Sequence, residues 1–564
     1  MSYLDWGVLV LFFAYTLWDG IRAGKQGDSL QHQLLAGRRQ PWWLIGVSIM
    51  ASQASAITFI GATGQSFMHD MRFLQVYLGL PIAMIILCVT LVPFFHKLKV
   101  FTAYEALEKR FGLPVRLTTS AFFLISRGAS VGITIAAPAY VLALILGWPL
   151  STTIWLIGGF TTIYTLFGGI AAVLRTDFKQ MILMLFGLAF CFAFIINRLP
   201  EGVSYGDALH LAGTMGKLEI LDFNWDLGQK YNVWSGVIAG LFMMLSYFGA
   251  DQSMVQRYLT ARSLGDARAS LIMSALFKVP MQFLILLLGV NLYVFYIFNE
   301  RPLLFIPDAA QEVSQHEGQF QTVHDARETA AWALLENPND PALKQKLQEY
   351  DHQAQSLRKA EIHQQGKSRN DTNYVFPYFM LHELPIGILG LLIAAIMAAA
   401  LSSIDTMLNS LAASSVVDWY QRLGSVPRSD KHYLWATYGF TAFWGLFATI
   451  TALFFGETES IIEVVNQLGS YFYGPLLGVF CLLWIPGANG RSAMIGLIGG
   501  LVVVLAIGSW HIHCDTGEMM FLNPVGSLPE GFHAKIEYLW LNPIGLLAVC
   551  ALGWIWGDRG TKKN

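Results

Sequence analysis

Long apolar stretches, most of them near 20 residues in length, alternate with short polar segments along this chain of 564 residues. A helix needs about 20 apolar residues to cross the hydrocarbon core of a bilayer. The pattern therefore predicts an all-α integral membrane protein with about thirteen transmembrane helices. The expected spans are 6–20, 41–68, 74–95, 117–146, 151–167, 178–196, 234–258, 270–298, 386–417, 434–455, 461–484, 493–510 and 541–556.

The amount and distribution of charge agree with this class and give an orientation. Charged residues make up 13% of the chain, about half of the roughly 25% found in soluble domains. Short loops on one side of the expected spans hold 21 Lys and Arg residues, and those on the other side hold 5. Because positive loops remain in the cytoplasm, we expect a multi-pass protein of the plasma (inner) membrane with its N-terminus outside and its C-terminus inside. The lipid bilayer is an expected partner, and nucleic acid is not.

One polar segment, residues 299–373, is much longer than the others and contains a helix-like run from Ala342 to Tyr350. The charge rule covers loops under about 60 residues, so it does not place this segment. The segment is too short and too polar for a catalytic domain. We expect a small helical cap on the outer face.

Residues 48–66 form a span with an unusual composition. Small and hydroxyl side chains dominate it, and Gln53 lies among them. A broken helix whose free carbonyls face a cavity would use such residues, and so would close helix packing through small side chains. The segment alone leaves both interpretations open.

Residues 394–412 combine alanines with oxygen-bearing side chains. Spacings of three and four residues place adjoining polar groups on one helix face, namely Ser402, Asp405, Thr406 and Asn409. A carboxylate at depth costs about 2.5–3.5 kcal/mol to insert, so it is a functional candidate. Its oxygen atoms suit a hard cation such as sodium. Pairing of Asp405 with a neighbouring amide is the structural alternative.

Two basic side chains, Arg127 and Lys278, fall inside apolar spans. Arg127 lies about 15 Å from the start of its span at 1.5 Å per residue, too deep to reach the interface. Asp405 and Glu463 are the few acids expected at depth, and if Asp405 binds sodium, Arg127 lacks an internal partner. Arg127 either holds an anionic substrate bidentately or ties helices together.

Motifs of other function classes are missing. Gly24-Lys25 does not belong to a GxxxxGK[ST] motif, so we expect an ion gradient and not a nucleotide to drive the protein. No HExxH motif occurs, so an enzyme is not expected. The five cysteines form no CxxC pair, and the run from His511 to Cys514 lacks a second ligand group. We expect no cofactor, and sodium only as a coupling ion.

Four segments in this order resemble the sodium:solute symporters, a family that includes sodium-coupled sugar, proline, iodide and sialic-acid carriers. The segments are Ala51-Ser52-Gln53-Ala54-Ser55-Ala56 with Phe59-Ile60-Gly61; Gly168-Gly169-Ile170 with Arg175-Thr176-Asp177-Phe178-Lys179-Gln180; Tyr247-Phe248-Gly249-Ala250-Asp251-Gln252 with Gln256-Arg257-Tyr258 and Ala261-Arg262-Ser263; and Ala398-Ala399-Ala400-Leu401-Ser402-Ser403 with Asn409-Ser410. Each segment alone is a weak signal, but together they are specific, and the resemblance covers nearly the whole chain.

The resemblance implies a LeuT-like fold of two inverted five-helix repeats. Its expected parts are a leading transmembrane helix with a cytoplasmic loop (1–40), a first repeat (41–196), an extracytoplasmic loop (197–233), a second repeat that includes the polar insertion (234–484), and two trailing helices with a short cytoplasmic tail (485–564).

The resemblance also implies sodium sites. In the family, sodium is held by carbonyls of the broken first core helix and by a carbonyl and two hydroxyls of the eighth, which map to Ala51, Ala54, Ala399, Ser402 and Ser403. Some members of the family look to have a second sodium site. By resemblance, its positions map to Asp177, Asp405 and Thr406. Asp177 has an alternative role as a helix-end partner for Arg175 or Lys179.

Substrate positions of the family map to Gln53, Ser55, Ile57, Thr58, Tyr247 and Lys278. Ile57 and Met244 occupy positions where sugar carriers have polar groups, which argues against a sugar. The hydroxyl pattern of the first core helix is closer to the sialic-acid carriers. However, Ser130 occupies the position of their carboxylate-binding arginine, and Arg127 lies one turn earlier, so the substrate stays open.

The expected function is that of a sodium-coupled secondary active symporter, which imports a small organic solute by alternating access. A carboxylate or other anion is one substrate class that Arg127 would fit. A proton-coupled carrier of the same fold, an ion channel and a sensor are the alternatives. Sodium dependence of uptake at fixed pH separates the first alternative, and conductance without saturable uptake would indicate a channel.

The orientation can be tested with single cysteines introduced at residues 340 and 105. We expect a membrane-impermeant thiol reagent to label position 340 in intact cells and to leave position 105 unlabelled until the cells are lysed. Equal labelling of both positions in intact cells would contradict the N-outside topology.

Overall fold

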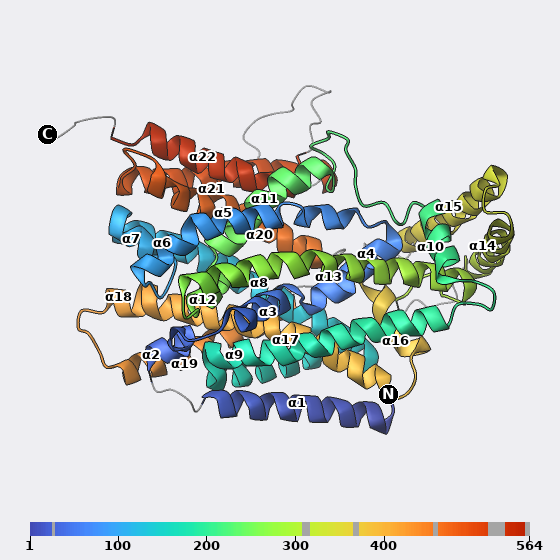
Figure 1. The fold of residues 1–564 in the computed structure, drawn as a ribbon, viewed down its shortest axis with the longest axis horizontal. Coiled ribbons are helices and arrows are strands. Elements are labelled where there is room, and N and C mark those ends of the chain that lie inside the picture. The colour runs from blue at the N-terminus through green and yellow to red at the C-terminus, as the bar shows by residue number, and fades with distance from the viewer. Residues whose placement is uncertain (25–28, 307–315, 365–370, 455–460, 517–535, 559–564) are drawn as a thin grey trace.

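The computed structural model describes residues 1–24, 29–306, 316–364, 371–454, 461–516 and 536–558. Across these ranges all regular elements are helices, and helices lie over each of the thirteen expected spans. Among the described residues, eight helices are long and apolar enough to cross a membrane, and a bent pair makes a ninth such span. The all-α membrane prediction is therefore confirmed. Figure 1 shows a bundle of roughly aligned helices, with α1 (Tyr3–Gly24) on one side and α21 (Gly490–Thr516) and α22 (Leu541–Ile555) on the opposite side.

Five spans make up the first half of the bundle. They are the bent span α3 (Trp42–Gln53), η2 (Thr58–Ala62) and α4 (Thr63–Met68); the segment η3 (Arg72–Tyr77), α5 (Leu80–Val89) and α6 (Leu91–Leu98); α8 (Leu113–Leu146); and the two parts of α9 (Leu150–Asn197).

The second half repeats this order. Its spans are η4 (Ser235–Ala239), α11 (Gly240–Gly249) and α12 (Gln252–Leu259); α13 (Leu264–Phe298); α17 (Ile388–Ser414); α19 (Asp430–Phe454); and α20 (Ile461–Cys481).

The first span of each half is broken near its middle. Helix α3 ends at Gln53, the backbone of the next residue, Ala54, leaves the helical region (φ −90°, ψ 56°), and the chain bends by 60° before η2. In the second half, Asp251 has an extended backbone between α11 and α12, and its side chain accepts from the backbone N–H of Ser253 at 2.9 Å. A helix break frees backbone groups that need partners in a protein interior or a cavity. The broken-helix interpretation of residues 48–66 is thus correct.

Helix α9 departs from the expected spans at residues 168–177, which the structure places inside a helix and not in a loop. The chain turns at Gly169 (φ 59°, ψ 178°), and the second part of the helix starts directly afterwards. Only glycine adopts this backbone conformation readily. Asp177 therefore lies within a helix, fully buried, and not at a solvated helix end.

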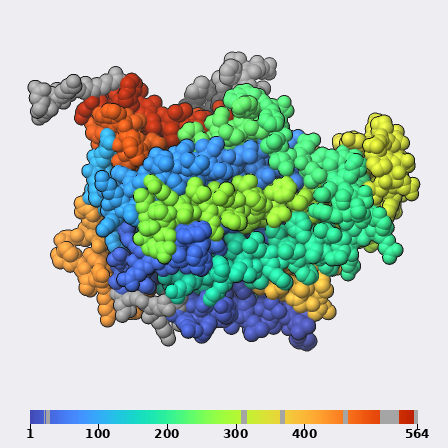
Figure 2. All heavy atoms as spheres, viewed as in Figure 1, coloured from blue at the N-terminus to red at the C-terminus, as the bar shows by residue number. Residues whose placement is uncertain are grey.

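The long polar segment does contain the expected helices, α14 (Glu317–Glu336) and α15 (Pro341–Gln364). They pack together and project from one end of the molecule (Figure 2). The Tyr293 hydroxyl of α13 donates to Asp351 of α15 at 2.7 Å. At the same end, the Lys217 ammonium donates to the carbonyls of Phe67 and Met68 at 2.9 Å each, and burial lowers the pKa of this ammonium to about 8. The cap is thereby linked to α13, and the segment after α10 (Tyr205–Thr214) is linked to the end of the first broken span.

The turn within α9 gives a stability test. A Cβ atom at Gly169 would meet the Gln33 amide oxygen at 2.6 Å, and the backbone conformation disfavours any other residue. We expect Gly169→Ala to lower the free energy of unfolding by about 1–3 kcal/mol, measured by thermal unfolding of the purified protein. Gly159→Ala in the same helix is the control, because a Cβ there meets nothing within 4 Å. Equal stability of the two variants would contradict this account.

Candidate substrate and sodium sites

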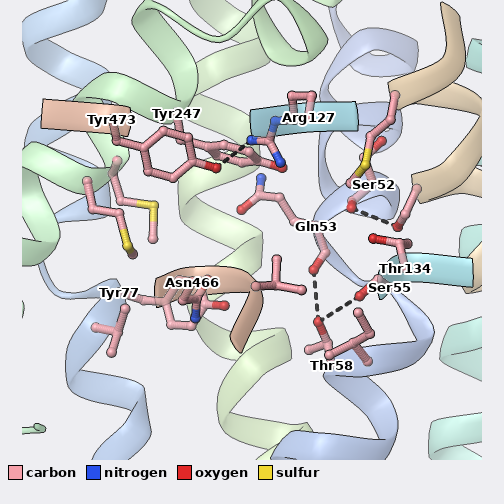
Figure 3. Close-up of a pocket in the computed structure, with 17 residues that line it drawn as sticks. Ser52, Gln53, Ser55, Thr58, Tyr77, Arg127, Thr134, Tyr247, Asn466 and Tyr473 are labelled. Carbon is pink, nitrogen blue, oxygen red and sulfur yellow. Dashed lines mark hydrogen bonds between the residues drawn. The ribbon is translucent and has the colours of Figure 1, made fainter. Parts of the chain in front are cut away.

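A cavity of about 120 Å³ lies between the two broken spans and the helices α8, α17 and α20. Figure 3 shows its lining side chains. They are Ser52, Gln53, Ser55, Ile57, Thr58, Val76, Tyr77, Arg127, Thr134, Met243, Met244, Tyr247, Ser403, Met407, Val465, Asn466 and Tyr473. Five expected substrate residues, Gln53, Ser55, Thr58, Arg127 and Tyr247, thus converge on one cavity.

The break in the first span supplies one wall of this cavity. The Thr58 hydroxyl donates to the Gln53 carbonyl at 3.1 Å, and it lies 3.5 Å from the Ser55 hydroxyl (Figure 3). Thr58 thereby satisfies a carbonyl that the helix no longer uses, and the Gln53 side-chain amide donates only a long bond, 3.4 Å, to the Ile49 carbonyl. The side chains of this wall are therefore placed to exchange weak internal bonds for bonds to a solute.

Arg127 lies at the other end of the cavity, together with Tyr247 and Tyr473 (Figure 3). Its guanidinium forms an ion pair with Asp251 and donates to the Tyr473 hydroxyl. The guanidinium carbon also lies 5.1 Å from the Tyr247 ring centre and 5.5 Å from that of Tyr473. The inference that Arg127 lacks an internal partner is therefore wrong, because the break in the second span brings Asp251 beside it. Arg127 both lines the cavity and ties helices together.

Lys278 lies next to the cavity but is not among its lining residues. Its ammonium is fully buried and donates to the Gln53 carbonyl and the Gln282 amide oxygen, at 3.2 Å each. It also lies 5.2 Å from the Tyr77 ring centre. Within the described ranges it has no carboxylate partner. The structure gives Lys278 the role of a support for the end of α3, and a direct solute contact stays a prediction.

The expected sodium ligands lie where the end of α3 meets the middle of α17. The Ser403 hydroxyl donates to the Ser52 carbonyl at 3.0 Å and to the Ala399 carbonyl at 3.2 Å. Ala51, Ala54, Ala399, Ser402 and Ser403 are all at most 2% exposed. The Ser402 hydroxyl has no hydrogen-bond partner among the described residues. A dry group of carbonyl and hydroxyl oxygens from two helices is the type of ligand set that a hard cation uses.

The expected second sodium residues form an ionic cluster with a residue from α12. Arg257 pairs with Asp177 at 2.8 Å and also donates to Ser48 and Thr406. Asp405 is fully buried and interacts electrostatically with both members of this pair. Two carboxylates and one guanidinium leave one uncompensated negative charge when both acids are ionised.

Both structural alternatives for these acids are wrong. Asp177 pairs with Arg257, whereas Lys179 pairs with Asp19. The Asn409 amide donates to the backbone carbonyl of Asp405 and not to its carboxylate. One oxygen of Asp177 and one of Asp405 lack a hydrogen-bond partner in the described part of the chain. These oxygens, with the excess charge that arises when both acids are ionised, make the cluster suitable for one monovalent cation.

Sequence analysis missed the roles of Asp251, Arg257 and Tyr473. Arg257 lies at the end of its expected span, 234–258, and was given no role there, although it is fully buried. A signal was present, because Asp251 precedes a short polar helix and could have been read as its N-cap. That Asp251 meets Arg127 depends on two helices that are 124 residues apart in the chain.

The run from His511 to Cys514 lies in α21, but its side chains fall outside the described residues. In the remainder that the structure does describe, no group of three or more His, Cys, Asp or Glu side chains is arranged to hold a metal ion.

Two broken helices that face a central cavity within a five-plus-five helix bundle define a LeuT-like membrane transporter fold. Among solved structures, a substrate-bound, outward-open Na⁺-coupled sialic acid symporter has this fold, with a TM-score of 0.75 at 24% identity over 98% of this chain and 97% of that one. The model of the sodium:solute symporter family matches residues 34–320 and 354–500. The chain belongs to the sodium:solute symporter family, so the resemblance noted in the sequence is confirmed.

Curated relatives span similar lengths. The sodium/sialic acid symporter SiaT of Proteus mirabilis is 27% identical over 90% of this chain and 89% of its own length. A putative sodium-dependent multivitamin transporter of Drosophila melanogaster is 24% identical over 97% and 84%. Human sodium-coupled monocarboxylate transporter 1 is 26% identical over 89% and 72%. These relatives and the family support sodium-coupled symport as the activity of the chain.

Proposed function

We propose that the chain imports a small organic anion together with sodium by alternating access. The observation that carries this proposal is that the cavity and the expected sodium site share residues. Ser403 and the residue whose carbonyl it bonds, Ser52, both line the cavity. An ion bound between α3 and α17 would therefore fix one wall of the solute site. Solute binding would then depend on sodium, because the two sites share this wall.

The substrate class is inferred from the lining of the cavity. Arg127 is the one charged side chain among the described lining residues, and Ile57 and Met244 make part of the wall apolar. Named substrates of the relatives include sialic acid and monocarboxylates. A carboxylate would reach Arg127 by replacing Asp251 as its partner, because the arginine is already neutralised. Because Asp251 already neutralises Arg127, the free protein does not need an anion at this position, but a carboxylate can take the place of Asp251.

An anionic substrate makes the second cation site energetically important. A tenfold sodium gradient supplies about 1.4 kcal/mol, and a membrane potential of 100 mV adds about 2.3 kcal/mol per charge. One sodium ion with one monovalent anion moves no net charge, so the gradient alone would sustain roughly tenfold accumulation. Two sodium ions would supply about 5.1 kcal/mol, or roughly 5,000-fold accumulation. We therefore assign sodium to the cluster of Asp177, Asp405 and Thr406 as well as to the first site.

The proposed setting is the plasma (inner) membrane, with the N-terminus outside and the α14–α15 cap on the outer face. From Thr58 the first broken span continues to Met68, where the carbonyls of Phe67 and Met68 accept from Lys217. We infer that the solute enters from the outer side, as import requires. A proton-coupled carrier is the second candidate, since Asp177 and Asp405 could bind a proton in place of sodium. Uptake that persists without sodium at fixed pH would favour it.

The first site can be tested at its two hydroxyls. Ser402→Ala and Ser403→Ala each remove an oxygen from a dry ligand set, which costs about 1–3 kcal/mol. We expect each substitution to raise the half-saturating sodium concentration for uptake roughly 5- to 150-fold. Ser410→Ala is a control, because its hydroxyl bonds only to the Met407 carbonyl in the same helix. Wild-type sodium dependence in both serine variants would exclude this site.

The substrate class can be tested at Arg127. Arg127→Lys keeps the charge for Asp251 but loses the planar pair of donors. The loss of a charged hydrogen bond costs about 1.5–3 kcal/mol, so we expect roughly 10- to 150-fold weaker uptake of carboxylate substrates. Half-saturation by sodium in the absence of solute should stay close to that of the wild type, because the lysine still pairs with Asp251. Normal transport by Arg127→Gln would show that the arginine does not bind the solute.

A further inference from the structure

Helix α12 lies between the cavity and the ionic cluster, and it has no solvated face. All eight of its side chains are at most 4% exposed. It begins at the break of the second span and ends just before α13 (Figure 1). A helix this short is held in place by what its ends and side chains contact, not by its own hydrogen bonds.

An ion pair holds the beginning of α12 to the cavity. One carboxylate oxygen of Asp251 accepts from the backbone N–H and the hydroxyl of Ser253, at 2.9 and 2.6 Å. The other oxygen pairs with Arg127, which lines the cavity (Figure 3). The same side chain therefore caps the helix and neutralises the charged residue of the solute site.

A second ion pair holds the far end of α12 to the cation cluster. Arg257 contacts Asp177 of α9 and Thr406 of α17. Its Nε atom and one oxygen of Asp177 have no hydrogen-bond partner within the described ranges. The residues that hold this end are thus the ones that a second sodium ion would bind.

Each ligand would compete with one of these ion pairs. A carboxylate that binds Arg127 competes with Asp251, and a sodium ion that binds Asp177 competes with Arg257. The solute carboxylate and Asp251 are both anions, and sodium and Arg257 are both cations. In a dry interior, two groups of like charge cannot share one partner at low cost. The two exchanges take place near the two ends of α12 and loosen the same helix.

Two further contacts show what a displaced α12 would affect. The Gln252 amide accepts from the backbone N–H of Ala103 at 2.9 Å and donates to the Phe101 carbonyl at 3.1 Å. The Gln256 amide donates to the Leu34 carbonyl at 2.8 Å. These bonds join α12 to the segments that contain Phe101 and Leu34. The charge distribution assigns both segments to the cytoplasmic side. Movement of α12 would therefore weaken these contacts on the cytoplasmic side of the cavity.

We propose that α12 couples the two ligands, with Asp251 as the positioning residue that holds Arg127 until an anion replaces it. Release of one end of the helix lowers the cost of releasing the other end, so sodium and the anion favour each other's binding. This inference rests on the proposed function, and it assigns the coupling to one helix and two ion pairs. The coupling is reciprocal, because each ligand must raise the affinity for the other by the same factor.

The test measures sodium titrations of the purified full-length protein by thermal unfolding, with N-methylglucamine replacing sodium at constant ionic strength. The probe anions are N-acetylneuraminate and lactate, each present or absent. In the wild type, we expect at least one probe to lower the half-saturating sodium concentration 5-fold or more. In Asp251→Asn, we expect half-saturation to be several-fold lower without any anion, and to change less than 2-fold when the anion is added.

Asparagine can still cap α12 through its side-chain oxygen, so the variant keeps the local fold. Asp266→Asn is the matched control, because Asp266 also lies at a helix start and pairs with an arginine, Arg262, at 2.8 Å, away from the cavity. The control should keep the wild-type coupling factor. Arg257→Lys tests the other end, since lysine is a weaker competitor at Asp177 and should also reduce the coupling.

The outcomes separate this inference from the proposed function. Wild-type coupling in both Asp251→Asn and Arg257→Lys would overturn the role of α12 and leave sodium-coupled anion transport intact. A wild-type sodium titration that neither anion shifts would overturn the exchange at Arg127. Uptake by the wild type in proteoliposomes that does not depend on sodium would overturn the proposed function itself.

Discussion

The pairing of charges inside a low-dielectric helix bundle is the constraint on which the rest of the structure depends. A buried ion without a partner costs several kcal/mol, and the hydrocarbon around the bundle offers no water in its place. Arg127 and Arg257 meet this constraint through Asp251 and Asp177. Because both pairs involve residues of the second broken span, they fix its position relative to α8 and α9. The geometry of the central cavity follows from these two pairs.

The same constraint applies to the backbone groups that the helix breaks set free. Thr58 bonds the Gln53 carbonyl, and Ser403 bonds the Ser52 carbonyl. Hydroxyl side chains are suited to this task, because they satisfy a carbonyl and can still offer an oxygen to a ligand. The residues that make a broken helix tolerable are therefore also the residues that build the walls of the cavity and of the first cation site.

Charge balance then distinguishes the two ligand sites. At Arg127 the free protein is already neutral, so a solute anion has to exchange with an internal carboxylate. Around Arg257 the two acids Asp177 and Asp405 leave one negative charge in excess when both are ionised, so a cation that binds there balances the cluster and competes with Arg257 for Asp177. In the proposed mechanism, sodium supplies a charge that the protein lacks, whereas the solute replaces one that the protein provides.

The sequence by itself determined the class, the order of the helices and most of the residues around the cavity. Those features depend on local hydrophobicity and on short motifs, such as the hydroxyl-rich segment around Gln53 and the Ser402–Ser403 pair, which keep their meaning without knowledge of distant contacts. The tertiary structure decided which charges meet. Asp177 looks like a helix-end residue in the sequence, and the sequence assigns no partner to Asp251 or Arg257, because hydropathy records only neighbours along the chain. Their burial and pairing arise from contacts between helices that are 80 or more residues apart, and such long-range contacts are not encoded in any local pattern.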